Sequence, residues 1–150
     1  MGVVRAFKEG DGVSSLVKHM TQEAINLFEG SSGRRGPSQF TDEETARGTL
    51  GTRGTVASGR MSLSFALELL RRFFGADLFN RGGMVDVRFL RPVRPGDTLT
   101  LTGHVTGVAQ EANGHRVIVE VAATNDRGET TAAGTGYCLV PRGFLPPEEG

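Results

Sequence analysis

The tripeptide Ala57-Ser58-Gly59 stands directly before the longest helical pattern in the chain, and it is the first place to look for chemistry. The helix expected after it, Arg60–Phe74, is apolar on nearly every side. A helix without a polar face must be buried by other parts of the fold, and the remaining segments are mostly strand-like. Ser58 lacks the G-x-S-x-G nucleophile motif, because Val56 and Arg60 occupy the glycine positions. The sequence therefore favours Ser58 as the helix N-cap.

Glu68 is the only carboxylate within this helix and lies about two and a half turns after Gly59. A carboxylate at such a depth could act as a base or as a nucleophile. The alternative is an ion pair with Arg71 or Arg72, since side chains three and four residues apart on a helix are neighbours. The sequence favours the ion pair and leaves the catalytic role open.

The three histidines, His19, His104 and His115, are too far apart in the sequence to form a local ligand pair. A single cysteine, Cys138, cannot build a zinc site, so we expect no metal. His19 comes just before the first predicted helix and is the only histidine near the presumed site. It is therefore a further candidate for a catalytic role.

Composition argues against several classes of function. The 17 basic and 17 acidic side chains cancel, so no net charge attracts the chain to nucleic acid. No apolar run approaches the roughly 20 residues of a membrane-spanning helix, and the N-terminus lacks the layout of a signal peptide. The single cysteine rules out an internal disulfide framework and fits a reducing compartment. We expect a cytoplasmic protein that binds neither nucleic acid nor membrane.

The order of the elements predicts an α+β fold in one domain, residues 1–150, with a flexible tail at 141–150. Short helices are expected from Thr21, a suitable N-cap, to about Glu29 and over Asp42–Arg47, where Thr41–Glu44 has capping-box spacing. After Gly75 the apolar period changes to two, which predicts strands. The expected strands are Val13–Lys18, Met84–Leu90, Thr98–Ala109, Arg116–Thr124 and Thr131–Val140. Asn113-Gly114 predicts a two-residue hairpin loop. The whole is expected to be an antiparallel sheet curved around one central helix.

From Met20 to Val105 the order of motifs resembles the MaoC-like hydratase/dehydratase family of the hot-dog fold. The most specific part is the string RFLRPVRPGDTL, which combines a strand, a bend between prolines and a Pro-Gly-Asp turn. The resemblance implies a site for an acyl thioester, carried by coenzyme A or an acyl-carrier protein, with no other cofactor. It also implies that the Gly59 N–H at the helix start binds the thioester carbonyl, assisted by the helix dipole.

The acid/base motif of the family is replaced in this chain. Where R-specific hydratases carry S-G-D-x-N-P-x-H, this sequence has Ser32 to Gln39, with Arg34 in place of the aspartate and Gln39 in place of the histidine. Arginine cannot lose a proton in a protein, and glutamine does not exchange one near neutral pH. The chain is thus expected to be a MaoC-like hydratase/dehydratase with divergent catalytic residues, and ordinary enoyl-CoA hydration is doubtful.

Several residues and alternatives remain as candidates on this basis. The candidate catalytic residues are Ser58, Gly59, Gln39, Arg34, His19 and Glu68, and the arginines that could meet the phosphates of the carrier are Arg60, Arg88 and Arg91. The alternatives are a hot-dog thioesterase that uses Glu68 and a non-catalytic subunit that binds a ligand or a partner chain. An isolated hot-dog fold would expose sheet edges and half of its cleft, so we expect at least a homodimer.

Overall fold

The computed structural model describes residues 7–31, 38–50 and 54–143. Its elements, in chain order, are β1 (Gly12–His19), α1 (Gln22–Ser31), α2 (Glu43–Leu50), α3 (Gly59–Phe74), α4 (Ala76–Gly82), β2 (Gly83–Phe89), β3 (Thr98–Glu111), β4 (Gly114–Thr124) and β5 (Thr130–Pro141).

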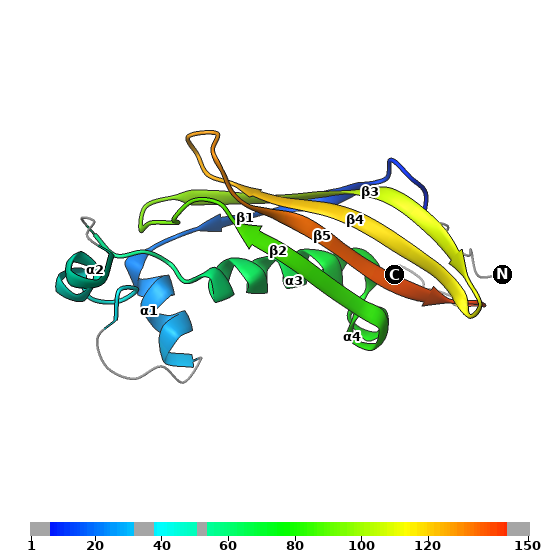
Figure 1. Cartoon of the computed structure of the whole chain (residues 1–150), viewed down its shortest axis with the longest axis horizontal. Coiled ribbons are helices and arrows are strands. Elements are labelled where there is room, and N and C mark those ends of the chain that lie inside the picture. The colour runs from blue at the N-terminus through cyan, green and yellow to red at the C-terminus, as the bar shows by residue number, and fades with distance from the viewer. Residues whose placement is uncertain (1–6, 32–37, 51–53, 144–150) are drawn as a thin grey trace, which may run out of the picture.

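The five strands form one sheet in the order β1-β3-β4-β5-β2, and every neighbouring pair is antiparallel. Figure 1 shows the sheet curving over α3, with α1 and α2 at the end where α3 begins. Leu99, Leu101 and Val105 on β3 point into the core and are at most 3% exposed, whereas Thr102 and His104 on the other face are exposed. This alternation confirms the predicted strand faces, and the arrangement confirms the predicted α+β hot-dog fold.

The sheet covers only one face of α3. The buried residues on that face are Met61, Ser62, Ala66, Leu69, Leu70, Phe73 and Phe74. Leu63 and Leu67, which are not in this buried set, remain half-buried. The helix therefore keeps half-buried and exposed residues in the described part of a single chain, because one curved sheet can contact only one side of a helix.

Close approach of α3 to the sheet depends on small residues in β5. A Cβ atom at Gly136 would lie 2.4 Å from Cδ1 of Leu70, well inside van der Waals contact. The glycine lets the helix lie close to this strand. At its end α3 stops at Gly75, whose φ of 92° suits the residue after a helix and whose N–H donates to Arg71 O at 2.8 Å.

The helix caps agree with the prediction at α1 and differ from it at α2. Thr21 Oγ1 accepts the Ala24 N–H at 3.0 Å, which confirms Thr21 as the cap of α1. At α2 the cap is Asp42, whose Oδ2 accepts the Thr45 N–H at 2.8 Å. Thr41 instead accepts the Ser38 N–H at 3.2 Å, so the predicted capping box is displaced by one residue.

Three further boundaries differ from the predictions. The helix α4 was not expected, because its pattern is only seven residues long and follows Gly75 directly. The hairpin loop is Ala112-Asn113, since Glu111 pairs with Gly114; a Cβ at Gly114 would lie 2.1 Å from Val140 O on β5. Pro141 belongs to β5 and the Arg142 N–H donates to Asn113 O; residues 144–150 of the predicted tail lie outside the described residues. In the described residues no helix is both long and apolar enough to span a bilayer.

Candidate functional site

A cleft of about 330 Å³ opens where α3 begins. One wall is the start of the helix, with Ala57, Ser58, Gly59 and Ser62, and the other is the connection after β2, from Phe89 to Val93, with Thr131 beside it. The two walls are joined by a single bridge, in which the Ala57 N–H donates to Val93 O at 2.7 Å. The residues Ala57–Gly59, where the sequence predicts the site, therefore line a cleft.

Ser58 occupies the N-cap position but does not act as an ordinary cap. Its backbone is extended, with φ −69° and ψ 153°, yet its hydroxyl makes no cap hydrogen bond. The side chain is 4% exposed, and its Oγ finds no hydrogen-bond partner in the described part of the chain. A buried hydroxyl without a partner costs free energy, so this oxygen suits a ligand atom in the cleft better than it suits the protein alone.

Gly59 is the first residue of α3, so its N–H has no acceptor within the helix. A Cβ at this position would lie 2.7 Å from Cε2 of Phe89. The Phe89 ring thus lies against the helix start, although this side chain is 54% exposed. Sequence reasoning missed Phe89, because nothing in the string RFLRP shows that its ring reaches a glycine thirty residues earlier.

A second, much smaller space continues from the cleft into the core. The two share Ser62, and the second space measures about 10 Å³, roughly one water molecule. It lies between α3 and the sheet, and its walls are mostly small residues: Ser62, Ala66, Val87, Leu101, Val121, Ala122, Ala123, Ala132 and Ala133. The cleft therefore leads toward an apolar chamber that is almost closed in this structure.

Gln39 and Arg34, which are predicted to stand in the positions of the family acid/base pair, differ in what the structure describes. Gln39 is half-buried, and its backbone carbonyl accepts the Val56 N–H at 3.1 Å. This hydrogen bond places Gln39 next to the segment that leads to Ser58. Arg34 lies outside the described residues. Among the residues that line the cleft in the described chain, none is a carboxylate or a histidine.

Glu68 and His19 do not line the cleft. The Glu68 carboxylate lies 2.7 Å from Lys18 Nζ on β1 and 3.4 Å from Arg72 Nη2. The ion pair with Arg72 was one of the sequence alternatives, while Arg71 instead bonds Asn80. The pKa of Glu68 is lowered, chiefly by the hydrogen bond from Lys18. His19 is exposed at the end of β1, with Nδ1 3.3 Å from Thr98 Oγ1.

The three candidate phosphate-binding arginines are dispersed. Arg60 extends from the helix start to Glu29 of α1, with 3.3 Å between Nη2 and Oε2. Glu29 is 1% exposed, and sequence reasoning missed it as a buried acid. Arg88 is exposed on β2. Arg91 lines the cleft and donates from Nη1 to Thr130 O at 2.7 Å. Only Arg91 of the three lines the cleft.

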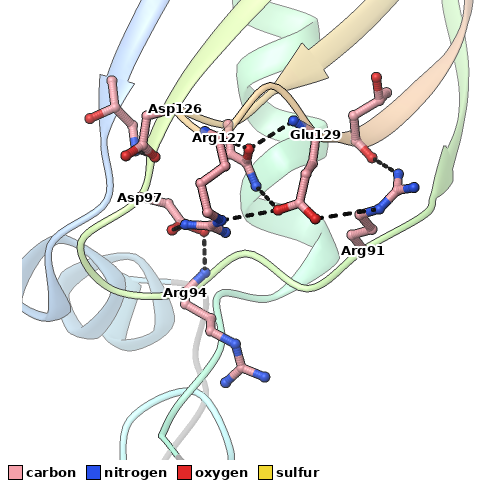
Figure 2. A network of polar contacts seen from close by, with 9 residues as sticks. Arg91, Arg94, Asp97, Asp126, Arg127 and Glu129 are labelled. Carbon is pink, nitrogen blue, oxygen red and sulfur yellow. Dashed lines mark hydrogen bonds and ion pairs between the residues drawn. The ribbon is translucent and has the colours of Figure 1, made fainter.

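Sequence reasoning also missed a network of charged side chains behind Arg91. It links the connection after β2 with the turn between β4 and β5 and includes Arg91, Asp97, Arg127 and Glu129, as Figure 2 shows. Asp97 and Arg127 are thirty residues apart, and no short-range pattern joins them. The Pro-Gly-Asp turn gave a signal for Asp97 alone.

The chemistry available in the cleft is binding and polarisation of a carbonyl group. A helix N-terminus favours a partial negative charge, and Gly59 N–H and Ser58 Oγ can both donate a hydrogen bond. Proton transfer to carbon would need a base, and the described lining residues supply none. In the described ranges no group of three or more His, Cys, Asp or Glu is placed to hold a metal ion.

Comparison with known proteins agrees with this geometry. A family profile described as "MaoC like domain" matches residues 9–127. The chain is 33% identical over 98 residues to 3-hydroxyacyl-thioester dehydratase Z of Mycobacterium tuberculosis, covering 63% of this chain and 64% of that protein. It thus spans slightly less than two thirds of that relative's length.

Two further similarities extend over more of the chain. An (R)-specific enoyl-CoA hydratase of Rhodospirillum rubrum is 33% identical over 107 residues, 69% of each chain. The crystal structure of a MaoC-like dehydratase from Rhodospirillum rubrum superimposes with a TM-score of 0.72 at 26% identity, covering 93% of this chain and 96% of that chain. The chain belongs to the family described as MaoC like domain.

Proposed function

We propose that the cleft at the start of α3 binds an acyl thioester of coenzyme A or of an acyl-carrier protein, with the thioester carbonyl at Ser58 and Gly59. The observation that carries this proposal is the buried Ser58 hydroxyl, which has no partner in the described chain and lies beside the open N-terminus of the helix. The names of the relatives, a 3-hydroxyacyl-thioester dehydratase and an enoyl-CoA hydratase, support the same substrate class.

The acyl group would extend from the carbonyl past Ser62 toward the small-residue chamber beside α3. That chamber measures only about 10 Å³, so it admits a long acyl chain only if α3 or the sheet moves. The shape therefore favours a short acyl group. Butyryl-CoA is expected to bind more tightly than dodecanoyl-CoA, and the reverse order in titration calorimetry would contradict this assignment.

A pair of serine variants tests carbonyl binding. Ser58→Ala removes a buried hydroxyl without a partner, so the free energy of unfolding should stay equal or rise, while affinity for butyryl-CoA should fall roughly five- to tenfold for one lost hydrogen bond. Ser64→Ala is the matched control, because the Ser64 hydroxyl bonds Met61 O within the same helix. If no acyl-CoA binds the unmodified protein at millimolar concentration, the proposed function is wrong.

We propose that the protein is a divergent member of the hydratase/dehydratase group and that ordinary enoyl-CoA hydration is very weak. A missing general acid or base typically costs about a hundredfold to ten-thousandfold in rate, and both family groups are replaced, by Arg34 and Gln39. Crotonyl-CoA at neutral pH should give turnover well below one per second. Arg34→Asp combined with Gln39→His should raise that rate; turnover of several per second by the natural protein would show that other residues carry the proton.

Two alternatives remain within the proposal. A thioesterase would use Glu68, whose carboxylate stays ionised but is paired with Lys18 and Arg72; release of free coenzyme A that Glu68→Gln abolishes would favour it. A non-catalytic subunit would bind acyl-CoA and turn over neither crotonyl-CoA nor its saturated analogue. The absence of an acid/base residue from the described lining of the cleft favours this second alternative over the first.

We further propose a homodimer in the cytoplasm, with no cofactor beyond the carrier of the acyl group. Among the described residues both sheet edges, β1 and β2, lack a strand partner on one side, and α3 keeps half-buried apolar side chains such as Leu63. Arg60, Arg88 and Arg91 are the proposed contacts of the carrier phosphates. The cytoplasmic location rests on the single cysteine, Cys138, which cannot form an internal disulfide.

A further inference from the structure

The cleft wall from Leu90 to Val93 contains no helix and only one bridge, at Val93. We infer that the turn between β4 and β5, Asn125–Glu129, fixes this wall against the start of α3, and that Arg127 is the positioning residue for the site. The part of this inference that concerns a bound ligand rests on the proposed function; the part that concerns the wall does not.

The turn is held in one shape by its own hydrogen bonds. Asn125 is 5% exposed, and its Oδ1 accepts the N–H groups of Arg127 and Glu129, both at 3.0 Å. Its Nδ2 donates to Glu129 Oε1 at 3.0 Å. The backbone closes the loop through the Asn125 N–H to Glu129 O at 2.9 Å. A turn fixed in this way can serve as an anchor for another segment.

Arg127 connects this turn to the far end of the wall, after Val93. Its Nη1 lies 2.9 Å from Asp97 Oδ1, and its Nε lies 3.0 Å from Glu129 Oε1. The Asp97 side chain is only 5% exposed, and its second oxygen accepts the Arg94 N–H at 3.0 Å. The guanidinium thus neutralises a buried carboxylate that itself closes the bend after Val93, as Figure 2 shows.

The near end of the wall is held from the same turn. Arg91 Nε lies 3.9 Å from Glu129 Oε2, and Arg91 Nη1 donates to Thr130 O at 2.7 Å. The backbone N–H of Leu90 also donates to Thr131 O at 2.8 Å. The wall is therefore attached at its far end to the turn through Asp97 and at its near end to Glu129 of the turn and to Thr130 and Thr131 at the start of β5. Pro92 and Val93 lie between the two attachments.

One hydrogen bond connects the wall to the start of α3. Val93 O accepts the Ala57 N–H at 2.7 Å, and Ala57 directly precedes Ser58 and Gly59. If the Arg127 contacts are lost, the turn no longer fixes the position of the bend at Asp97. The Val93 carbonyl is then also no longer held in place relative to the turn. The donors that face the ligand then lose their alignment, although Arg127 itself does not line the cleft.

Amide hydrogen exchange measures how firmly the wall is fixed to the start of α3, and it needs no ligand. In Arg127→Met the Ala57 amide should exchange at least about tenfold faster relative to the amide of Val119, a core residue of β4, because local opening is then uncoupled from global unfolding. Arg127→Lys should restore part of the protection. The control is Arg116→Met, which removes an equally charged residue, paired with Glu111, at the opposite end of β4. If Arg127→Met accelerates both amides equally, Arg127 only stabilises the fold and the inference is wrong.

The ligand-bound state gives a second readout. The carbonyl stretching band of ¹³C-labelled butyryl-CoA should shift to lower frequency in the natural protein and shift less in Arg127→Met at saturation. An unchanged band in the variant overturns the positioning role for the ligand, whereas a natural protein that binds no thioester overturns the proposed function and leaves the exchange result standing. If Arg127→Met does not fold, Glu129→Gln weakens the same links to Arg127 and Arg91 and is judged by the same ratio of exchange rates.

Discussion

At the scale of single residues, the site is defined by what its polar groups lack. Ser58 presents a buried hydroxyl without a described partner, and Gly59 presents an N–H that no helix turn can satisfy. Such groups are ordinarily paired inside proteins. Here both residues line a cleft, where a carbonyl oxygen could supply the missing partner. The described lining of the cleft contains no carboxylate or histidine, so binding is better supported than catalysis.

Gly59→Ala is predicted to impair binding without unfolding the protein. The new methyl group would meet the Phe89 ring at 2.7 Å, and that ring is exposed enough to move at a cost of about 1 kcal/mol or less. The moved ring would enter the cleft, so affinity for butyryl-CoA should fall about tenfold, which corresponds to ~1.4 kcal/mol. Gly59→Ala with Phe89→Ala should regain most of the loss. The control Gly107→Ala meets its nearest neighbour at an ordinary 3.5 Å; equal losses in both variants would contradict the prediction.

Glu68→Gln is predicted to change stability in a pH-dependent way. The hydrogen bond from Lys18 lowers the pKa of Glu68 below its ordinary 4.5, so its stabilisation is present above pH 4.5 and is lost as the pH falls through the folded-state pKa. Because the side chain is one-third exposed, the effect at pH 7 should not exceed about 1 kcal/mol. Urea unfolding at pH 7 and at pH 3 should show the difference narrowing in acid. The exposed carboxylate variant Asp86→Asn is the control, and a difference that grows in acid would be inconsistent with the ion pair.

At the scale of elements, the contact between α3 and β5 decides how tightly the core closes. Gly136→Ala would put a methyl group 2.4 Å from Leu70 Cδ1, and Leu70 is fully buried. Overpacking of this kind costs about 1–3 kcal/mol. Adding Leu70→Val should recover part of the loss, because the shorter side chain makes room. Guanidinium unfolding measures both variants, and a neutral Gly136→Ala would show that the helix can move away from the strand at no cost.

At the scale of the whole molecule, the uncovered face of α3 and the open edges of the sheet predict self-association. Leu63→Glu places a charge on the half-buried apolar side of the helix, so it should weaken a homodimer by at least tenfold, since a buried charge without a partner is strongly unfavourable. Sedimentation velocity over a concentration series measures this. Leu27→Glu, at a position 72% exposed on α1, should leave the dimer intact. A natural protein that sediments as a monomer at all concentrations would refute the dimer.

The sequence by itself determined the features that depend on neighbours within a few residues. The long apolar run after Ser58 gave α3, the period of two gave the faces of β3, and Thr21 and Gly75 gave helix ends. These signals are local because helix caps and amphipathic faces are set by spacings of one to four residues. They were sufficient for a curved antiparallel sheet around one central helix, while the hot-dog fold itself came from the resemblance to the MaoC-like family.

Only the tertiary structure decided which distant groups meet. Phe89 covers Gly59, Lys18 of β1 pairs with Glu68, and Arg127 pairs with Asp97 across thirty residues. Each contact depends on strand register and on the curvature of the sheet, which bring separate turns to one end of the molecule. A register shift of one residue would turn the strand side chains Phe89 and Lys18 to the other face of the sheet, so no local pattern could have specified these contacts.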